Sequence, residues 1–139
     1  MKLLSSGSYS IAWFKLADIV SRGEKERALS VYKLLMHSIQ DEAFAYQLEG
    51  DILLAFDDDG AFDRYHIAAG IYQKNGNYQK AISIYEHAIL FKSDIKILKS
   101  LLNLYLAHEN NHLLTKFMAK LKVTNECFYE VAQNILIEE

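Results

Sequence analysis

Apolar residues recur along most of the chain at the three- and four-residue spacing of amphipathic helices. Between residues 65 and 74 they form one stripe of Tyr65, Ala68, Ala69 and Tyr72. Along the whole chain, this spacing predicts eight helices, at residues 9–22, 24–38, 42–56, 60–74, 78–91, 94–108, 112–121 and 124–138. No segment alternates apolar and polar residues over the length of a strand, so the predicted fold class is all-α.

Turn-forming residues separate the apolar segments. Residues 75–77 are Asn-Gly-Asn, and these residue types tolerate the left-handed backbone that closes a tight turn between helices. Asp41, Ser93 and Thr124 each precede an apolar segment. Their side chains are predicted to accept hydrogen bonds from the first amides of the helix that follows.

A pattern of apolar and small residues repeats along the chain. Its best copy is Tyr65-x2-Ala68-Ala69-x2-Tyr72, followed by Ala81-x3-Tyr85-x2-Ala88. Weaker copies begin at Ala12, Tyr46 and Leu98, so the step from Tyr46 to Tyr65 is little more than half of the steps before and after it. The two longer steps match a period of about 34 residues, which is typical of proteins whose helical units bury their apolar faces against their neighbours.

The order of a large residue, a small pair and an aromatic, then alanine, aromatic and alanine, resembles the tetratricopeptide repeat (TPR) family. The resemblance implies an α-solenoid of antiparallel helix hairpins, in one domain over residues 1–139. Repeats are expected at about 9–41, 43–75, 62–94 and 95–123, with a capping helix at 124–138. The chain departs from the family pattern at Lys15 and Glu49, where apolar residues are expected, and in having no proline.

The composition narrows the class of partner. Of the 139 residues 51% are hydrophobic, which is enough for a continuous core. The formal net charge of -3 gives no overall basic field to attract nucleic acid or an anionic membrane. No apolar stretch approaches the ~20 residues of a membrane span, and the N-terminal apolar run is too short for a secretory signal. We therefore expect a cytoplasmic protein without membrane insertion.

Two short motifs suggest metal chemistry, but their context argues against it. Residues 108–112 read His-Glu-Asn-Asn-His and match the H-E-x-x-H zinc motif, but the predicted helices place them in a turn. A calcium loop opening at Asp57 would need glycine at position 62 and glutamate at position 68, where the chain has Phe62 and Ala68. Cys127 is the single cysteine and is expected to be buried. We expect no catalytic site, metal or cofactor; a zinc hydrolase using His108, Glu109 and His112 is a remote alternative.

The resemblance also implies where a partner binds. In the TPR family the first helices of the repeats line an inner groove. Carried onto this chain, that groove receives Trp13, Val20, Phe44, Gln47, Asp51, Leu54, His66, Lys74, Lys96, Lys99 and Asn103. Its N-terminal end is then apolar and its C-terminal end basic, which suits a peptide or helix with an apolar anchor and acidic residues.

The predicted function is a non-catalytic protein–protein interaction module, either an adaptor or a chaperone-like protein. Core packing is an equally good interpretation of Trp13 and Phe44, and a solvated helix face is the alternative for Lys96 and Lys99. A self-assembling unit is the alternative function. The first helix has apolar residues around much of its circumference, including Phe14, and this predicts a homodimer or partner contact through that helix.

Overall fold

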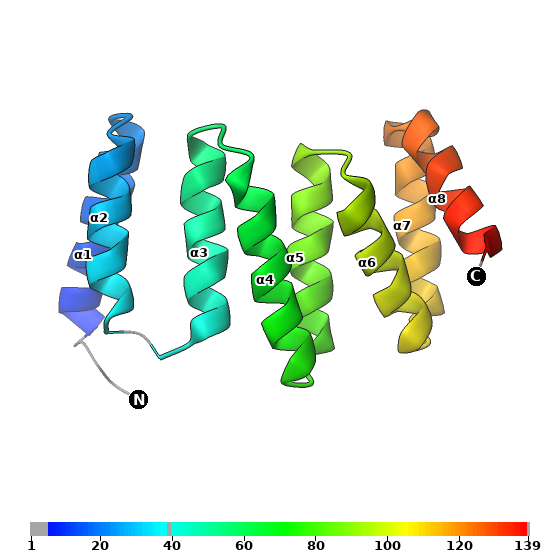
Figure 1. Cartoon of the computed structure of the whole chain (residues 1–139), viewed down its shortest axis with the longest axis horizontal. Helices are drawn as coiled ribbons and strands as arrows, with labels where there is room; N and C mark the ends of the chain where they lie inside the picture. Colours follow the sequence, from blue (N-terminus) through cyan, green and yellow to red (C-terminus); the bar gives the residue numbers. More distant parts are fainter. Residues whose placement is uncertain (1–5, 39, 139) are drawn as a thin grey trace. The chain divides into compact units, whose positions relative to one another are not determined.

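The computed structural model describes residues 6–38 and 40–138, with the side chains of residues 14–38 and 40–138. The described residues form eight α-helices and no strand (Figure 1). The helices are α1 (Ser6–Ser21), α2 (Lys25–Met36), α3 (Glu42–Ala55), α4 (Gly60–Lys74), α5 (Tyr78–Phe91), α6 (Ile95–Ala107), α7 (Asn111–Thr124) and α8 (Glu126–Glu138). The all-α prediction is therefore confirmed, and every helix end lies within three residues of its predicted position.

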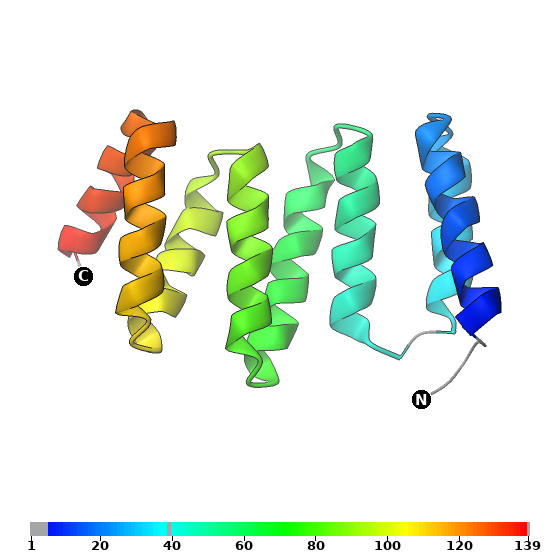
Figure 2. The same ribbon diagram turned by 180° about the vertical axis from the view of Figure 1, so that it is seen from behind.

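Contacts within the chain divide it into two compact units, an N-terminal unit (Met1–Ile71) and a C-terminal unit (Tyr72–Glu139). In the N-terminal unit α1 packs against α2, and α2 packs against α3. In the C-terminal unit each helix from α5 to α8 packs against the next, and α6 also packs against α8. Figures 1 and 2 show that α6 and α8 lie on one side of the C-terminal unit, and α5 and α7 on the other.

The same backbone turn ends four of the helices, α1, α3, α4 and α6. In each turn one residue has a positive φ, namely Gly23 (75°), Asp57 (55°), Gly76 (81°) and Glu109 (52°). Its amide bonds the carbonyl three residues earlier at 3.0 to 3.3 Å, and the next amide bonds the carbonyl five residues before it at 2.8 to 3.3 Å. These two bonds define the Schellman motif, which satisfies the last carbonyls of a helix.

The spacing of these turns matches the predicted repeat. Gly23, Asp57, Gly76 and Glu109 each lie the same number of positions after the start of a copy of the sequence pattern. The steps between the turns are therefore long, short and long, as the steps between the copies are. The turn predicted at residues 75–77 is confirmed, with Gly76 in the left-handed position. The backbone thus repeats with the same irregular register as the side-chain pattern.

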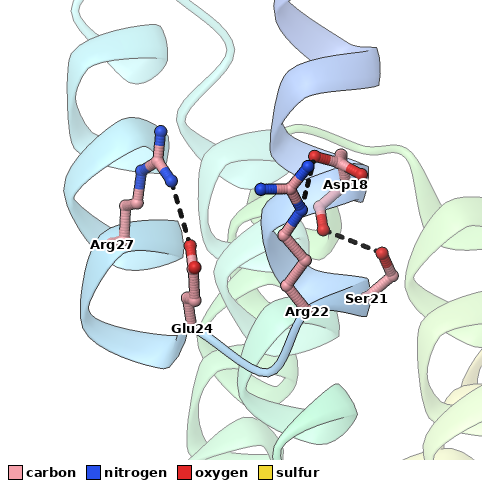
Figure 3. Close-up of polar contacts among 5 residues, drawn as sticks. All are labelled: Asp18, Ser21, Arg22, Glu24 and Arg27. Carbon is pink, nitrogen blue, oxygen red and sulfur yellow. Dashed lines mark hydrogen bonds and ion pairs between the residues drawn. The ribbon is translucent and has the colours of Figure 1, made fainter.

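Polar side chains around the first of these turns are exposed. Arg22 Nε lies 3.0 Å from Asp18 Oδ2, and Arg27 Nη1 lies 3.1 Å from Glu24 Oε2 (Figure 3). Ser21 Oγ also donates to the carbonyl of Asp18 at 2.8 Å. Exposed ion pairs of this kind contribute about 0 to 1 kcal/mol each. The turn is therefore set mainly by its backbone bonds and by Gly23.

The helix starts agree with one of the three predicted caps. Asp41 accepts a hydrogen bond from the amide three residues on at 3.0 Å, as predicted. Ser93 does not cap α6; Asp94 does, at 3.2 Å. Thr124 is the last residue of α7 and donates to the carbonyl of residue 120, while Asn125 caps α8 at 3.1 Å. Both predictions were wrong by one residue, because the chain stays extended one residue longer before the next helix begins.

The core of the N-terminal unit joins its first three helices. It consists of Leu16, Ile19, Ala28, Tyr32, Leu35 and Ile52. The Tyr32 hydroxyl donates to the carbonyl of Ala45 at 2.6 Å, which links α2 to α3. The ring of Tyr32 thus fills the core while its polar end is satisfied by the neighbouring helix.

A close approach between α3 and α4 depends on Gly50. A Cβ atom at Gly50 would lie 2.8 Å from ring carbon Cε1 of Tyr65. The Tyr65 hydroxyl donates to the carboxylate of Asp51, which holds the ring in place. Beside it, Arg64 Nε lies 2.8 Å from Glu49 Oε1. This ion pair accounts for Glu49, which stands where the repeat pattern expects an apolar residue.

In the C-terminal unit α6 is the most buried helix. Leu98, Leu101, Leu102 and Tyr105 have no exposed surface, because α5, α7 and α8 all pack around this helix. The Tyr105 hydroxyl donates to the carboxylate of Glu86 on α5. Like Tyr32 and Tyr65, Tyr105 has a buried ring whose hydroxyl reaches a polar group on an adjacent helix.

Burial changes the acidity of these tyrosines. Desolvation, with a smaller contribution from the charge of Glu49, raises the pKa of Tyr32 to about 12. Desolvation, followed by the hydrogen bond to a carboxylate, also raises the pKa values of Tyr65 and Tyr105. Burial raises the pKa of Tyr85, whose hydrogen bond with Ser100 acts in the opposite direction. In the folded protein all four hydroxyls therefore keep their protons at pH values where exposed tyrosines ionise.

The close approach at Gly50 predicts opposite effects for one substitution at two glycines. Gly50→Ala should lower the free energy of unfolding by about 1 kcal/mol, because overpacking against the fixed Tyr65 ring outweighs the helix propensity of alanine. Gly70→Ala, at an exposed helical position with no atom within 4 Å of the added Cβ, should raise it by about 0.5 to 1 kcal/mol. Urea unfolding of both variants measures the difference. Equal stabilisation of both would contradict the close approach.

The tyrosine pKa values predict a loss of stability at alkaline pH. Above the unfolded pKa of 10.0 the unfolded chain releases tyrosine protons that the folded chain retains. The free energy of unfolding should therefore be unaffected by these groups below pH 10 and fall steadily between pH 10 and 12. Urea titrations across this range, with tyrosinate absorbance as a second probe, test it. A Tyr32→Phe variant should show a shallower pH dependence; an identical slope would argue against the Tyr32 contribution.

Candidate functional site

The H-E-x-x-H motif lies in the turn between α6 and α7, as predicted. His108 is the C-cap residue directly after α6, Glu109 has the left-handed backbone, and His112 is in the first turn of α7. The imidazole of His108 stacks on the ring of Tyr78, with 3.6 Å between ring centroids. Within residues 6–38 and 40–138, no three His, Cys, Asp or Glu side chains form a group that could hold a metal ion. The structural role of the motif is therefore to form a helix-ending turn.

The acidic run at residues 57–60 also forms a turn. Asp57 has the positive φ of the Schellman motif. Asp58 uses both carboxylate oxygens, since Oδ2 lies 2.7 Å from Lys25 Nζ and Oδ1 accepts the amide of Gly60 at 2.8 Å. The hydrogen bond from Lys25, followed by that from Gly60, holds the pKa of Asp58 below its ordinary value. These contacts tie the start of α4 to the start of α2.

The expectation for Cys127 was wrong, because its side chain is exposed. The buried residues of α8 are Phe128, Ala132 and Ile135, which form the inward stripe. Cys127 precedes that stripe by one residue and so falls on the outward face of the helix.

The predicted partner-binding residues of the N-terminal unit are mostly half-buried. Val20 packs against the core. Phe44, Gln47 and Leu54 are half-buried positions on one face of α3. Asp51 is exposed and accepts the hydrogen bond from Tyr65. The side chain of Trp13 lies outside the described residues, so its predicted exposure stays a prediction.

The remaining predicted binding residues are all exposed. His66 and Lys74 lie on α4, whereas Lys96, Lys99 and Asn103 lie on α6. The α6 residues are three and four positions apart, so they share one face of that helix. They form a short basic stripe, but they do not line the groove that lies between α5 and α7.

A groove of about 660 Å³ lies between α5 and α7 in the C-terminal unit. Its apolar lining includes Leu121 and Phe128, which are buried, and Ile89 and Phe117, which are half-buried. Leu90 and Phe91 also line it, although they are 65% and 56% exposed. Two large apolar side chains therefore reach solvent beside an apolar floor. A groove of this size with exposed apolar side chains is a candidate binding site.

Basic residues line the α7 wall of this groove. Lys116 and Lys120 are exposed and one helical turn apart on α7, which contains no acidic residue. Neither lysine has an ion-pair partner within the described part of the chain. Lys92 also lines the groove, and the lining carboxylate, Glu86, accepts the hydroxyl of Tyr105. The groove therefore carries an excess of positive charge.

A hydrogen bond connects two helix junctions that line the groove. Asn125 Nδ2, at the junction of α7 and α8, donates to Ser93 Oγ, at the junction of α5 and α6, over 3.0 Å. This bond ties together the ends of the two walls. The groove is thus part of the folded C-terminal unit, with a defined wall spacing at that end.

Sequence reasoning did not identify this groove. The sequence signals were Leu90 and Phe91, two large apolar residues outside the stripe of Ala81, Tyr85 and Ala88, and a pair of lysines on a helix without acids. Neither signal shows by itself that α5 and α7 face a common groove. That follows only from the packing of both helices against α6.

Comparisons with known proteins assign no family to the chain. No family model matches it, and neither a curated protein nor a solved structure matches it. None of the helices formed by residues 6–38 and 40–138 has the length and apolar character needed to cross a membrane. The structure defines an all-helical protein whose C-terminal unit contains a groove with an apolar floor and lysines on its α7 wall.

The turn at Glu109 predicts a stabilising substitution within the H-E-x-x-H motif. A left-handed backbone costs a non-glycine residue about 1 to 2 kcal/mol, so Glu109→Gly should raise the free energy of unfolding by about 0.5 to 1 kcal/mol after the entropy cost of glycine. Glu130→Gly, at an exposed position inside α8, is the control and should lower it by about 1 kcal/mol. Thermal unfolding compares them; destabilisation by both would show that the turn at Glu109 is not strained.

Proposed function

We propose that the chain is a divergent helical-repeat protein of the tetratricopeptide type, an α-solenoid that binds other proteins and has no catalytic site. Two observations support the fold proposal. The helix-ending turn recurs at the same intervals as the side-chain pattern, and α6 packs against both α7 and α8 as a stacked repeat requires.

The groove between α5 and α7 is the observation that carries the functional proposal. Leu90 and Phe91 expose large apolar surfaces beside an apolar floor. Exposing this surface to water is unfavourable, and a partner that covers it gains the free energy of burial, about 25 cal/mol per Å². Anchoring side chains in a pocket, surrounded by charged residues, are typical of interfaces in which a few residues supply most of the binding energy.

Several polar side chains of the groove are engaged by other groups of the protein, which supports the proposal of a binding role. His87 lies with its ring edge against Phe91, with 5.0 Å between ring centroids. Glu86 accepts the hydroxyl of Tyr105, and Ser93 accepts the amide of Asn125. The contact of His87 lies within α5, whereas those of Glu86 and Ser93 connect different elements of the C-terminal unit.

A self-assembling unit is the second candidate function, favoured by Phe14. This side chain on α1 is 75% exposed, while Leu16 and Ile19 of the same helix face the core. A helix that is apolar on two sides gains stability when its outer side is covered. A second copy of the chain, meeting α1 across a two-fold axis, would provide that cover.

One set of surface variants separates the two functions. Leu90→Glu places a charge in the groove, Phe14→Glu places one on α1, and Ile137→Glu is a matched control at a side chain that is 81% exposed and outside the groove. Tagged proteins are used to capture partners from the native host, with quantitative mass spectrometry. We expect Leu90→Glu to reduce a captured partner by about tenfold or more, and Phe14→Glu and Ile137→Glu to retain it.

Sedimentation velocity of the same purified proteins measures their oligomeric state and so tests the self-assembly alternative. A wild-type dimer that becomes monomeric in Phe14→Glu, together with unchanged capture by Leu90→Glu, would replace the adaptor proposal by self-assembly. Circular dichroism of each variant checks that it remains helical, which we expect because all three positions are exposed.

A further inference from the structure

We infer that the groove between α5 and α7 binds an acidic amphipathic helix of a partner protein. In this complex leucine- or phenylalanine-type side chains of the partner contact the apolar floor, and its carboxylates face Lys116 and Lys120. The inference rests on the proposed function, because it names the chemistry of the partner at the same groove.

The dimensions of the groove favour a short helix. Its α5 wall runs over residues 83–91 and its α7 wall over residues 113–124, so the walls are about 12 and 17 Å long at 1.5 Å per residue. A helix of this length has about 8 to 11 residues and presents two or three apolar side chains on one face. Both walls are helices and offer no strand edge, so the bound segment cannot add a strand to a sheet, whereas a helix can place apolar residues at i, i+3 and i+4 into such a groove.

The charge of the groove favours carboxylates on that helix. Lys116 and Lys120 are four residues apart and therefore face the same side of α7. No acidic residue of α7 competes for them, and the lining carboxylate, Glu86, is engaged by Tyr105. An acidic helix thus gains two ion pairs at the edge of an apolar contact, whereas a basic helix is repelled.

The anchors and the lysines lie on opposite walls, which fixes how the partner is turned. Leu90 and Phe91 belong to the C-terminal end of α5, whereas Lys116 and Lys120 belong to α7. A helix lying between them needs its apolar stripe toward α5 and the floor, and its acidic side toward α7. The complementary ligand is therefore amphipathic with its acids on one flank of the apolar stripe, not acidic on all sides.

Selection from a peptide library tests this inference. The library displays 12-residue peptides with leucine and phenylalanine fixed at helical spacing and Glu, Gln or Lys varied at every other position. It is selected on the wild-type protein, with Leu90→Glu as the counter-selection. We expect enriched peptides to carry Glu beside the apolar stripe, and their affinity to fall with added salt.

Paired lysine variants then locate the charge effect. The double variant Lys116→Gln, Lys120→Gln should weaken binding of an enriched peptide by about fivefold or more. The matched double variant Lys96→Gln, Lys99→Gln removes two exposed lysines of α6 that do not line the groove, and should leave the affinity unchanged. Each double variant removes two positive charges, so a general electrostatic effect would lower the affinity of both equally, and that result would overturn the inference.

The outcomes distinguish the inference from the proposed function. Enrichment of Lys-rich or uncharged peptides that still need Leu90 would overturn the acidic partner and leave the groove as a protein-binding site. No enrichment over the Leu90→Glu background would count against both. A dimer that dissociates in Leu90→Glu would show that the groove holds a second copy of this chain, which also overturns the inference.

Discussion

Four of the helices end in one backbone turn, and the packing of both units depends on it. A residue with left-handed φ allows the chain to reverse within a few residues while two amides satisfy the last carbonyls of the helix. Because the turn is so short, it fixes the register of the helix before it. The residues four positions before each turn, Ile19, Leu53, Tyr72 and Tyr105, are all buried. The residues seven positions before it, Leu16, Gly50, Ala69 and Leu102, are buried as well.

The helix that follows each turn also has a buried residue at a fixed distance from it. The residues twelve positions after the left-handed residue are Leu35, Ala69, Ala88 and Leu121, and all four are buried. Ala69 appears in both sets because α4 follows the turn at Asp57 and precedes the turn at Gly76. This double use explains why the step between these two turns is so short. The small pair Ala68 and Ala69 of α4 is fully buried.

Much of the fold was predictable because it rests on local rules. The spacing of apolar residues predicted the eight helices, and the residue types of Asn-Gly-Asn at residues 75–77 predicted a tight turn with a left-handed backbone. The left-handed positions Asp57 and Glu109 are not glycines, so the sequence analysis did not identify their backbone conformation. The caps at Ser93 and Thr124 and the burial of Cys127 were wrong by a single residue, which is within the usual uncertainty of helix ends.

The groove was not predictable from the sequence, because the two helices that form its walls, α5 and α7, do not end in the recurring turn. At the ends of α5 and α7 the chain leaves the helix through an extended residue, Lys92 at φ -153° and Asn125 at φ -155°. The resemblance placed the binding surface on the first helices, where Lys96, Lys99 and Asn103 do share a face of α6.

These two extended junctions also bound the groove, through the bond between Ser93 and Asn125. Leu90 and Phe91, the last two residues of α5 before the first of these junctions, are exposed. The groove therefore lies beside two helix ends that lack the recurring turn.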